Sequence, residues 1–314
     1  MRRYVVFIFT ALFSLYAASA HADKAFTQTT SPSANGQKHV IPQRGTLYRA
    51  THGGNVSYLF GTIHVGQTAF YPLEPQVTRA LSDAKKLVIE VDIRDTEAMR
   101  LAIMRHGIYP DGQTINRHLS ADGSVQLRQA LKRVDIPFES VARMKPWMIA
   151  NLLLIQEMAR NGFPTEQGIE KYFISIAQEQ NKPIQELETA DYQLSLFDSM
   201  TDAEQEEYLR ENLAELANGD AMKKALALIT AWQNADARAL DGALLEMQKG
   251  ETASDRFLQQ VLLDKRNPNM ANKVETLLKT DKTSFVAVGA LHLLGDKGVP
   301  SLLQKRGYEV QKIY

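Results

Sequence analysis

The chain of 314 residues contains no cysteine, which excludes disulfide bonds, thiolate metal sites and cysteine nucleophiles. It also lacks an excess of charge of either sign, because 36 Lys and Arg residues balance 36 Asp and Glu residues. Such a balance provides no strong positive field for nucleic acid or anionic lipid. After residue 20 no apolar run is long enough to cross a bilayer. We therefore expect no nucleic-acid partner and no integral membrane span in the mature chain.

Three widespread catalytic signatures are also missing from the sequence. It contains no H-E-x-x-H, no G-x-S-x-G and no G-x-x-x-x-G-K-[ST] pattern, so the common zinc protease, serine hydrolase and P-loop interpretations lack support. The segment from Gly289 to Gly295 does not match a dinucleotide-binding fingerprint. Any catalytic site must therefore be built from residues that are distant in the sequence.

The first residues have the parts of a secretory signal. Arg2 and Arg3 give a positive start, residues 4–17 are apolar but short for a bilayer span, and residues 18–20 form an A-x-A cleavage pattern. The sequence predicts a signal peptide over residues 1–20 and a periplasmic or secreted bacterial protein. The alternative is an uncleaved membrane anchor.

The rest of the chain is organised as a polar segment followed by one folded domain. Residues 21–44 are rich in Ser, Thr and Gln and predict a disordered tether. Apolar runs then predict strands at residues 46–49, 56–63, 86–92, 182–188, 284–291 and 307–310. Helical periods fill residues 94–181 and 190–280, with Thr201, Thr252 and Ser254 as possible cap residues. We predict an α/β fold at residues 45–314, with a small mixed, mainly parallel sheet and two large helical insertions.

Two short phrases of the form Gly-x-x-His stand out. They are Gly61-Thr62-Ile63-His64 and Gly289-Ala290-Leu291-His292, and each closes an apolar run. Two further apolar runs close on the acids Glu90 and Glu188. If these runs are parallel strands, all four polar residues lie at the carboxyl edge of the sheet, where ligands bind in open α/β sheets. The glycines Gly61 and Gly289 would let a ligand or backbone approach closely.

This set of side chains suits a divalent metal ion. Two neutral imidazoles with one or two carboxylates can bind zinc, manganese, cobalt or iron(II). Such an ion lowers the pKa of a bound water to ~7. Asp92 shares a strand face with Glu90, so Asp92 or Glu188 could act as general base. The structural alternative is that the histidines are hydrogen-bonded strand ends and the acids are solvated.

These residues also resemble a known family. Residues 58–66, the acidic Glu90-Val91-Asp92 and residues 288–295 are together similar to the TraB/PrgY/GumN family, whose animal relatives are the Tiki proteins. The resemblance implies an α/β fold related to the erythromycin esterase and ChaN-like group. It also implies a peptidase dependent on manganese or cobalt. Carried over by position, it implies that His64, Glu90 and His292 form the catalytic or metal set.

Two further phrases resemble the family. In Glu166-Gln167-Gly168-Ile169-Glu170, relatives often have Asp at the last place, where this chain has Glu170. With Thr165 as N-cap of a helix over residues 166–180, Glu166 and Glu170 would lie one turn apart and face the cleft; the alternative is a solvated helix face. In the pair Arg266-Asn267, Arg266 could bind a substrate carboxylate or an oxyanion, or form a structural ion pair.

The sequence thus supports one main hypothesis and two alternatives. The main hypothesis is an exported metal-dependent hydrolase acting on a peptide or protein, with a manganese, cobalt or zinc ion on His64, Glu90 and His292. The first alternative is a non-catalytic periplasmic binding protein for a peptide or a haem-like ligand. The second is a structural factor of the cell envelope.

Overall fold

The structure is a computed structural model that describes residues 42–314. The predicted signal peptide over residues 1–20 and most of the predicted tether over residues 21–44 lie outside the described residues. Six strands form one mixed sheet in the order β4-β3-β5-β2-β1-β6. Their bounds are Leu47–His52 (β1), Asn55–Thr62 (β2), Lys86–Ile89 (β3), Ile184–Glu186 (β4), Thr283–Gly289 (β5) and Glu309–Lys312 (β6). The expected α/β class with a mainly parallel sheet is confirmed.

The antiparallel part of the sheet begins with a hairpin at His52-Gly53-Gly54-Asn55, which is a turn signal in the sequence. β1 pairs with β2 in a register that places His52 opposite Asn55. Between them Gly53 and Gly54 have φ angles of 55° and 85°, a left-handed conformation that glycine adopts without steric cost. β6 pairs antiparallel with the other edge of β1. It begins two residues later than the predicted start at residue 307, after a left-handed turn at Gly307.

Four strands, β2 to β5, run parallel to one another, and their carboxyl ends meet at one edge. β5 pairs with β2 on one side and with β3 on the other, and β3 pairs with β4. The register places Thr62 at the end of β2 opposite Gly289 at the end of β5. Ile89 at the end of β3 lies opposite Glu186 at the end of β4. Polar residues that directly follow these four strand ends therefore lie close to one another at the same edge of the sheet.

Helices cover both faces of the sheet. On one face Val88, Val286 and Val288 pack against the apolar sides of α12 (Asn267–Thr280) and α13 (Val299–Lys305). On the other face Leu87 and Phe285 pack into the main core with residues of α1 (Pro75–Asp83) and α6 (Ile169–Glu179). The alternation along each strand thus buries side chains in two separate cores.

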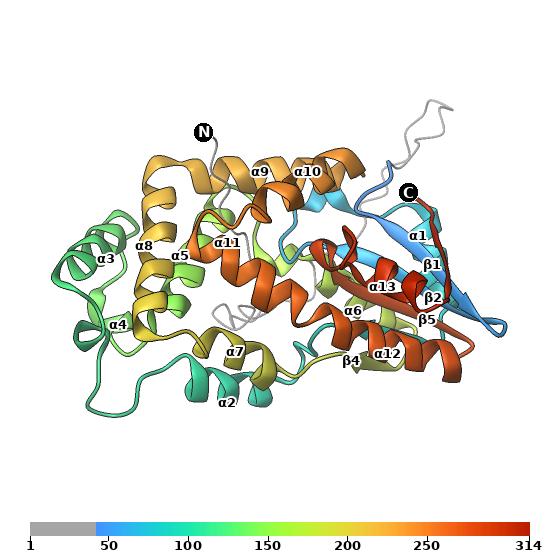
Figure 1. Cartoon of the computed structure of the whole chain (residues 1–314), viewed down its shortest axis with the longest axis horizontal. Helices are drawn as coiled ribbons and strands as arrows, with labels where there is room; N and C mark the ends of the chain where they lie inside the picture. Colours follow the sequence, from blue (N-terminus) through green and yellow to red (C-terminus); the bar gives the residue numbers. More distant parts are fainter. Residues whose placement is uncertain (1–41) are drawn as a thin grey trace.

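The remaining helices lie mostly beyond the sheet. Figure 1 shows the sheet toward one end of an elongated molecule and α3, α4, α5 and α8 at the other end. The bounds are Thr96–His106 (α2), Ala121–Arg133 (α3), Phe138–Val141 (α4), Pro146–Arg160 (α5), Ala190–Asp198 (α7), Asp202–Asn218 (α8), Asp220–Gln233 (α9), Ala237–Met247 (α10) and Ala253–Phe257 (α11). Short 3-10 helices span Thr68–Phe70, Ile115–Arg117, Thr165–Gln167 and Ala290–Leu293, and a π-helix spans Leu258–Asp264. Within residues 42–314, every helix is too short or too polar to span a membrane.

Local capping chemistry starts the helices where the sequence indicates. Thr201 and Thr252 are the N-caps of α8 and α11, and each forms a reciprocal capping box. α8 in turn caps two neighbours, because Glu206 accepts hydrogen bonds from Ser120 and Glu211 accepts them from the backbone of Ala253. The predicted caps Thr201 and Thr252 are confirmed, whereas Ser254 is wrong as a cap because it lies inside α11.

A buried carboxyl group joins the two ends of the described chain. Glu74, directly before α1, is 3% exposed and accepts a hydrogen bond from the hydroxyl of Tyr314. Arg44, within the predicted tether, is also buried and donates to the carbonyls of Pro42 and Ala69. Burial raises the pKa of Glu74 from 4.5 to about 7, although the Arg44 guanidinium opposes this shift.

Replacing Glu74 by glutamine is expected to stabilise the protein at pH 8 by roughly 1–3 kcal/mol. The folded protein holds the Glu74 proton more tightly than the unfolded chain, so stability falls as pH rises from 4.5 through about 7. Glutamine mimics the protonated acid and keeps an acceptor for Tyr314. Urea denaturation at pH 4 and pH 8 measures the effect. An equal difference between variant and wild type at both pH values would contradict this account.

Candidate functional site

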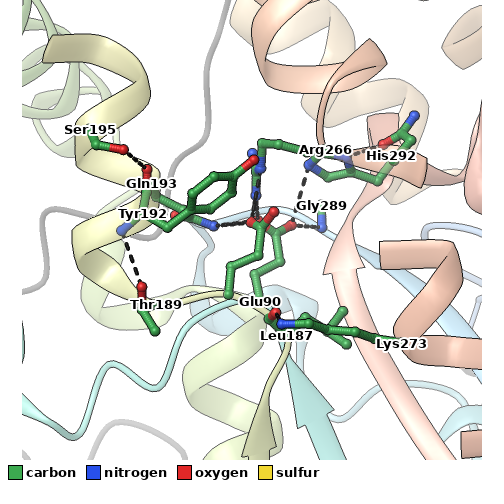
Figure 2. A network of polar contacts seen from close by, with 12 residues as sticks. Glu90, Leu187, Thr189, Tyr192, Gln193, Ser195, Arg266, Lys273, Gly289 and His292 are labelled. Carbon is green, nitrogen blue, oxygen red and sulfur yellow. Dashed lines mark hydrogen bonds and ion pairs between the residues drawn. The ribbon is translucent and has the colours of Figure 1, made fainter. Parts of the chain in front are cut away.

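Eight buried polar side chains gather at the carboxyl edge of the parallel strands. We call them the polar cluster, and each is between 1% and 6% exposed. They come from segments that follow β2, β3, β4 and β5 and from helices α6, α7 and α12 with the residue before α12. Figure 2 shows part of this network. Its members are His64, Glu90, Glu170, Glu188, Gln193, Arg266, Asn267 and His292.

Glu90 lies at the centre of the polar cluster, directly after β3. Its Oε1 atom accepts a 2.5 Å hydrogen bond from the backbone N–H of Gly289, and its Oε2 atom accepts one of 2.6 Å from Nη2 of Arg266. Burial alone would raise the pKa of Glu90. The imidazole of His292, the guanidinium of Arg266, His64 and the Gly289 N–H outweigh burial and lower this pKa to about 2. Glu90 is therefore ionised at neutral pH.

Arg266 joins Glu90 to a second carboxylate. Its Nε and Nη2 atoms donate to Oε2 of Glu188 over 2.9 and 2.6 Å, a charge-assisted contact that includes two donors. The arginine follows the π-helix over Leu258–Asp264, a geometry that often occurs at functional sites. Among residues 42–314, Oε1 of Glu188 is buried and has no hydrogen-bond partner. One carboxylate oxygen is thus left available in the polar cluster.

His292 is oriented by an asparagine. Its Nδ1 atom lies 2.6 Å from Oδ1 of Asn267, and Nδ2 of Asn267 donates to the carbonyl of Lys297 over 2.8 Å. The Asn267 oxygen must therefore be the acceptor, so the His292 proton is on Nδ1 and the lone pair is on Nε2. Burial lowers the pKa of His292 to about 3, which keeps the ring neutral. Its Nε2 atom lies 3.7 Å from Oε1 of Glu90.

His64 is oriented by a carboxylate in the same way. Its Nδ1 atom lies 2.8 Å from Oε1 of Glu170, which also accepts a hydrogen bond from the Thr62 hydroxyl. Burial opposes protonation of His64, but the carboxylates of Glu170 and Glu90 outweigh burial and raise its pKa. Because Nδ1 of His64 lies beside Glu170, its Nε2 atom points away from Glu170 and can contact another group.

The two imidazoles and Glu90 converge on the place where Gly289 lacks a side chain. A Cβ atom there would lie 3.2 Å from Oε1 of Glu90, 3.6 Å from Cδ2 of His292 and 3.9 Å from Nε2 of His64. Two atoms that can bind a divalent metal, Oε1 of Glu90 and Nε2 of His64, and the edge of the His292 ring thus surround one small space. As placed, no group of three or more His, Asp and Glu side chains among residues 42–314 is arranged to hold a metal ion.

The charge and hydrogen bonds of the polar cluster also fit a divalent cation. Three carboxylates against one guanidinium leave two negative charges when both imidazoles are neutral. Protonation of His64 would offset one of them, in accord with its raised pKa. Nδ1 of His292 donates its proton to Asn267, and Nδ1 of His64 lies 2.8 Å from Oε1 of Glu170, which are contacts that metal-ligating histidines commonly make. The residues present therefore fit such an ion.

Three predicted candidates do not face this space. Asp92 is bound by Arg94, with hydrogen bonds of 2.8 and 2.6 Å, and lies at the surface. Glu166 is exposed in the 3-10 helix over Thr165–Gln167, so the predicted helical turn joining it to Glu170 is wrong. Gly61 packs on Ala290 and accepts a hydrogen bond at its carbonyl from Trp232, which assigns it to backbone packing.

The start of α6 explains the error. The predicted N-cap Thr165 is wrong, because the backbone at Gly168 is extended and the helix begins at Ile169. A Cβ atom at Gly168 would lie 2.6 Å from the carbonyl oxygen of His64, and Ile169 donates its N–H to Ile63. This close approach brings Glu170 alone to His64.

The sequence prediction missed Gln193 entirely. This residue of α7 is 1% exposed, and its Nε2 atom donates to Oε2 of Glu188 over 2.9 Å and of Glu90 over 3.3 Å. A glutamine within a helix of ordinary composition carries no motif. The one available signal is its position five residues after the strand-end acid Glu188.

The chain is similar to known proteins over most of its described residues. The model of the TraB/PrgY/gumN family matches residues 46–312. The chain is 24% identical to the uncharacterized protein YbaP of Shigella flexneri over 80% of this chain and 89% of that protein. It is 26% identical to metalloprotease TIKI2 of Xenopus tropicalis, over 81% of this chain and 57% of that protein. It is 25% identical to metalloprotease TIKI1 of Homo sapiens, over 81% of this chain and 59% of that protein.

Proposed function

Because this chain belongs to the TraB/PrgY/gumN family, we propose that it is a metal-dependent hydrolase that cleaves peptides. The observation that carries the proposal is the convergence of His64, His292 and Glu90 on the space beside Gly289. The names of the Tiki relatives, which are metalloproteases, support the reaction class. The secretory pattern at residues 1–20 supports a place in the periplasm or outside the cell.

The metal ion would be held by Nε2 of His64, Nε2 of His292 and the Glu90 carboxylate, and manganese, cobalt or zinc suits these ligands. When bound, such an ion polarises a carbonyl and lowers the pKa of a water to ~7. Glu170 and Asn267 hold the two imidazoles in the required tautomer. They are positioning residues in this proposal.

Glu188 is the general base in this proposal. Its Oε1 atom is buried, and among the described residues it has no hydrogen-bond partner. Asp92, the other acid considered for this role, is bound by Arg94. Glu188 would take a proton from water as the hydroxyl adds to the carbonyl carbon, and would pass the proton to the leaving amine nitrogen. Arg266 lowers the pKa of Glu90 and forms an ion pair with both Glu90 and Glu188, which is the role its contacts support.

Metal removal and return test the proposal. Protein lacking residues 1–20 is treated with a chelator, dialysed, and supplied with Mn²⁺, Co²⁺ or Zn²⁺ before a peptide library is added. We expect cleavage products by mass spectrometry in the metal-supplied samples and none in the chelated sample. Cleavage that persists without metal would contradict the proposal. Peptide binding without products would favour the non-catalytic binding protein instead.

A substitution of Gly289 tests whether the metal binds at the space beside this residue. Gly289→Ala keeps a permitted backbone conformation (φ −50°, ψ 136°) but places a methyl group against Glu90 and His64. We expect metal affinity and cleavage to fall at least ~10-fold with little loss of stability. Gly242→Ala on α10 is the matched control, because no atom lies within 4 Å of its added Cβ. Unchanged metal affinity in Gly289→Ala would place the metal elsewhere.

A further inference from the structure

We infer that Gln193 is a positioning residue that sets the orientation of both carboxylates of the site, an inference that rests on the proposed function. Gln193 and Arg266 approach the same two oxygens. Nε2 of Gln193 donates to Oε2 of Glu188 and Oε2 of Glu90, and Nη2 of Arg266 donates to the same two atoms over 2.6 Å each. Figure 2 shows Glu90, Gln193 and Arg266 pointing toward one another.

The contacts of Gln193 and Arg266 with both Oε2 atoms give Glu90 and Glu188 different orientations and therefore different roles. With both Oε2 atoms held, the Oε1 atom of Glu90 is directed to Gly289 and the side of His292, at 2.5 and 3.7 Å. The Oε1 atom of Glu188 is left without a protein partner among residues 42–314. By holding both Oε2 atoms, Gln193 therefore orients Oε1 of Glu90 toward the proposed metal position. It also leaves Oε1 of Glu188 available to accept a proton from water.

A neutral donor suits this position better than a second cation. The polar cluster carries two negative charges when both imidazoles are neutral, a sum that matches a divalent ion. A lysine or arginine in place of Gln193 would hold the carboxylates but would cancel one of these charges and compete with the metal. An apolar side chain would leave the charge but release the carboxylates.

Gln205 shows what a purely structural glutamine looks like in this protein. It is 3% exposed on α8, and its Nε2 atom donates to the backbone carbonyl of Met200 over 3.1 Å. The Oε1 atoms of Gln193 and Gln205 are both buried without a partner among residues 42–314. The two residues differ in what the amide nitrogen donates to. For Gln193 the acceptors are two carboxylates, and for Gln205 the acceptor is one backbone carbonyl.

The test compares Gln193→Met with Gln205→Met, since each removes the amide and keeps the length of the side chain. For Gln193→Met we expect kcat to fall ~10–100-fold with KM within about twofold, and the Kd of Mn²⁺ to weaken ~10-fold. We expect a changed absorption spectrum with Co²⁺. Gln205→Met should leave kcat, metal affinity and the Co²⁺ spectrum as in the wild type.

A crystal structure of metal-free Gln193→Met decides the inference independently of catalysis. We expect the Glu188 carboxylate to move away from the Oε2 atom of Glu90. Carboxylates in unchanged positions would overturn the inference, as would Gln193→Met and Gln205→Met proteins with equal kcat and Kd. If wild-type protein cleaves no peptide, the proposed function fails. Displaced carboxylates together with weaker Mn²⁺ binding would then still support the positioning role.

Discussion

Replacing Arg266 by methionine is expected to cost about 3–5 kcal/mol of folding free energy. The guanidinium is 2% exposed and is bound by Glu90 and Glu188, which are 3% and 6% exposed. Methionine fills much of the volume but leaves both carboxylates buried with Gln193 as their remaining shared donor. Urea denaturation at pH 7 measures the loss, because the linear extrapolation to water gives the free energy of unfolding.

The same substitution has a defined pH dependence. The pKa of Glu90 is lowered from 4.5 to about 2, so its contribution to stability is present above 4.5 and is lost as pH falls toward 2. The difference between Arg266→Met and wild type should therefore shrink over this window. Arg94→Met is the control, because Arg94 pairs with Asp92 at the surface, where an ion pair contributes ~1 kcal/mol or less. Equal losses for both variants would show that Arg266 does not compensate the buried carboxylates.

His64→Ala and His292→Ala are each expected to reduce peptide cleavage by more than the ~100-fold typical of residues that act through a metal ligand. Each substitution removes one imidazole from the space beside Gly289 and takes the imidazole contact from Glu170 or Asn267. Because the two histidines would serve one ion, the double variant should be no worse than either single variant. Bound metal per chain and the cleavage rate are measured on the same preparations.

His106→Ala provides the matched control for losing a shielded imidazole. His106 contacts Asp191 and Asp198 of α7, within 3.1–3.2 Å, and its side chain is 13% exposed. Its loss should lower stability but leave metal content unchanged. Full metal content and cleavage in His64→Ala or His292→Ala would remove these residues from the proposed metal set.

Much of the candidate site follows from the direction of four strands. The apolar runs before His64, Glu90, Glu188 and His292 are recognisable locally, because β-branched and aromatic residues at short spacing favour buried strands. Parallel pairing then places all four polar residues at one edge. The shared edge position of these four residues follows from strand polarity and requires no knowledge of loop geometry.

The site residues that come from helices were harder to predict from the sequence. Glu170 faces His64 because an extended Gly168 delays the start of α6, and that delay depends on a close contact with the His64 backbone. Gln193 faces Glu188 because of the rotation of α7 about its axis, which the packing of neighbouring elements determines. Asp92 turned to Arg94, a partner two residues away that a strand-face argument does not consider.

The sequence by itself determined the strands, their polar ends, the hairpin turn and the helix caps at Thr201 and Thr252, because each depends on residues within a few positions of one another. The tertiary structure alone decided which ion pairs and hydrogen bonds the polar residues of the site form. It placed Arg266 between two carboxylates, gave each imidazole its own oxygen acceptor, and brought in Gln193. Contacts between residues far apart in the chain depend on packing, and side-chain packing is a property of the whole folded molecule.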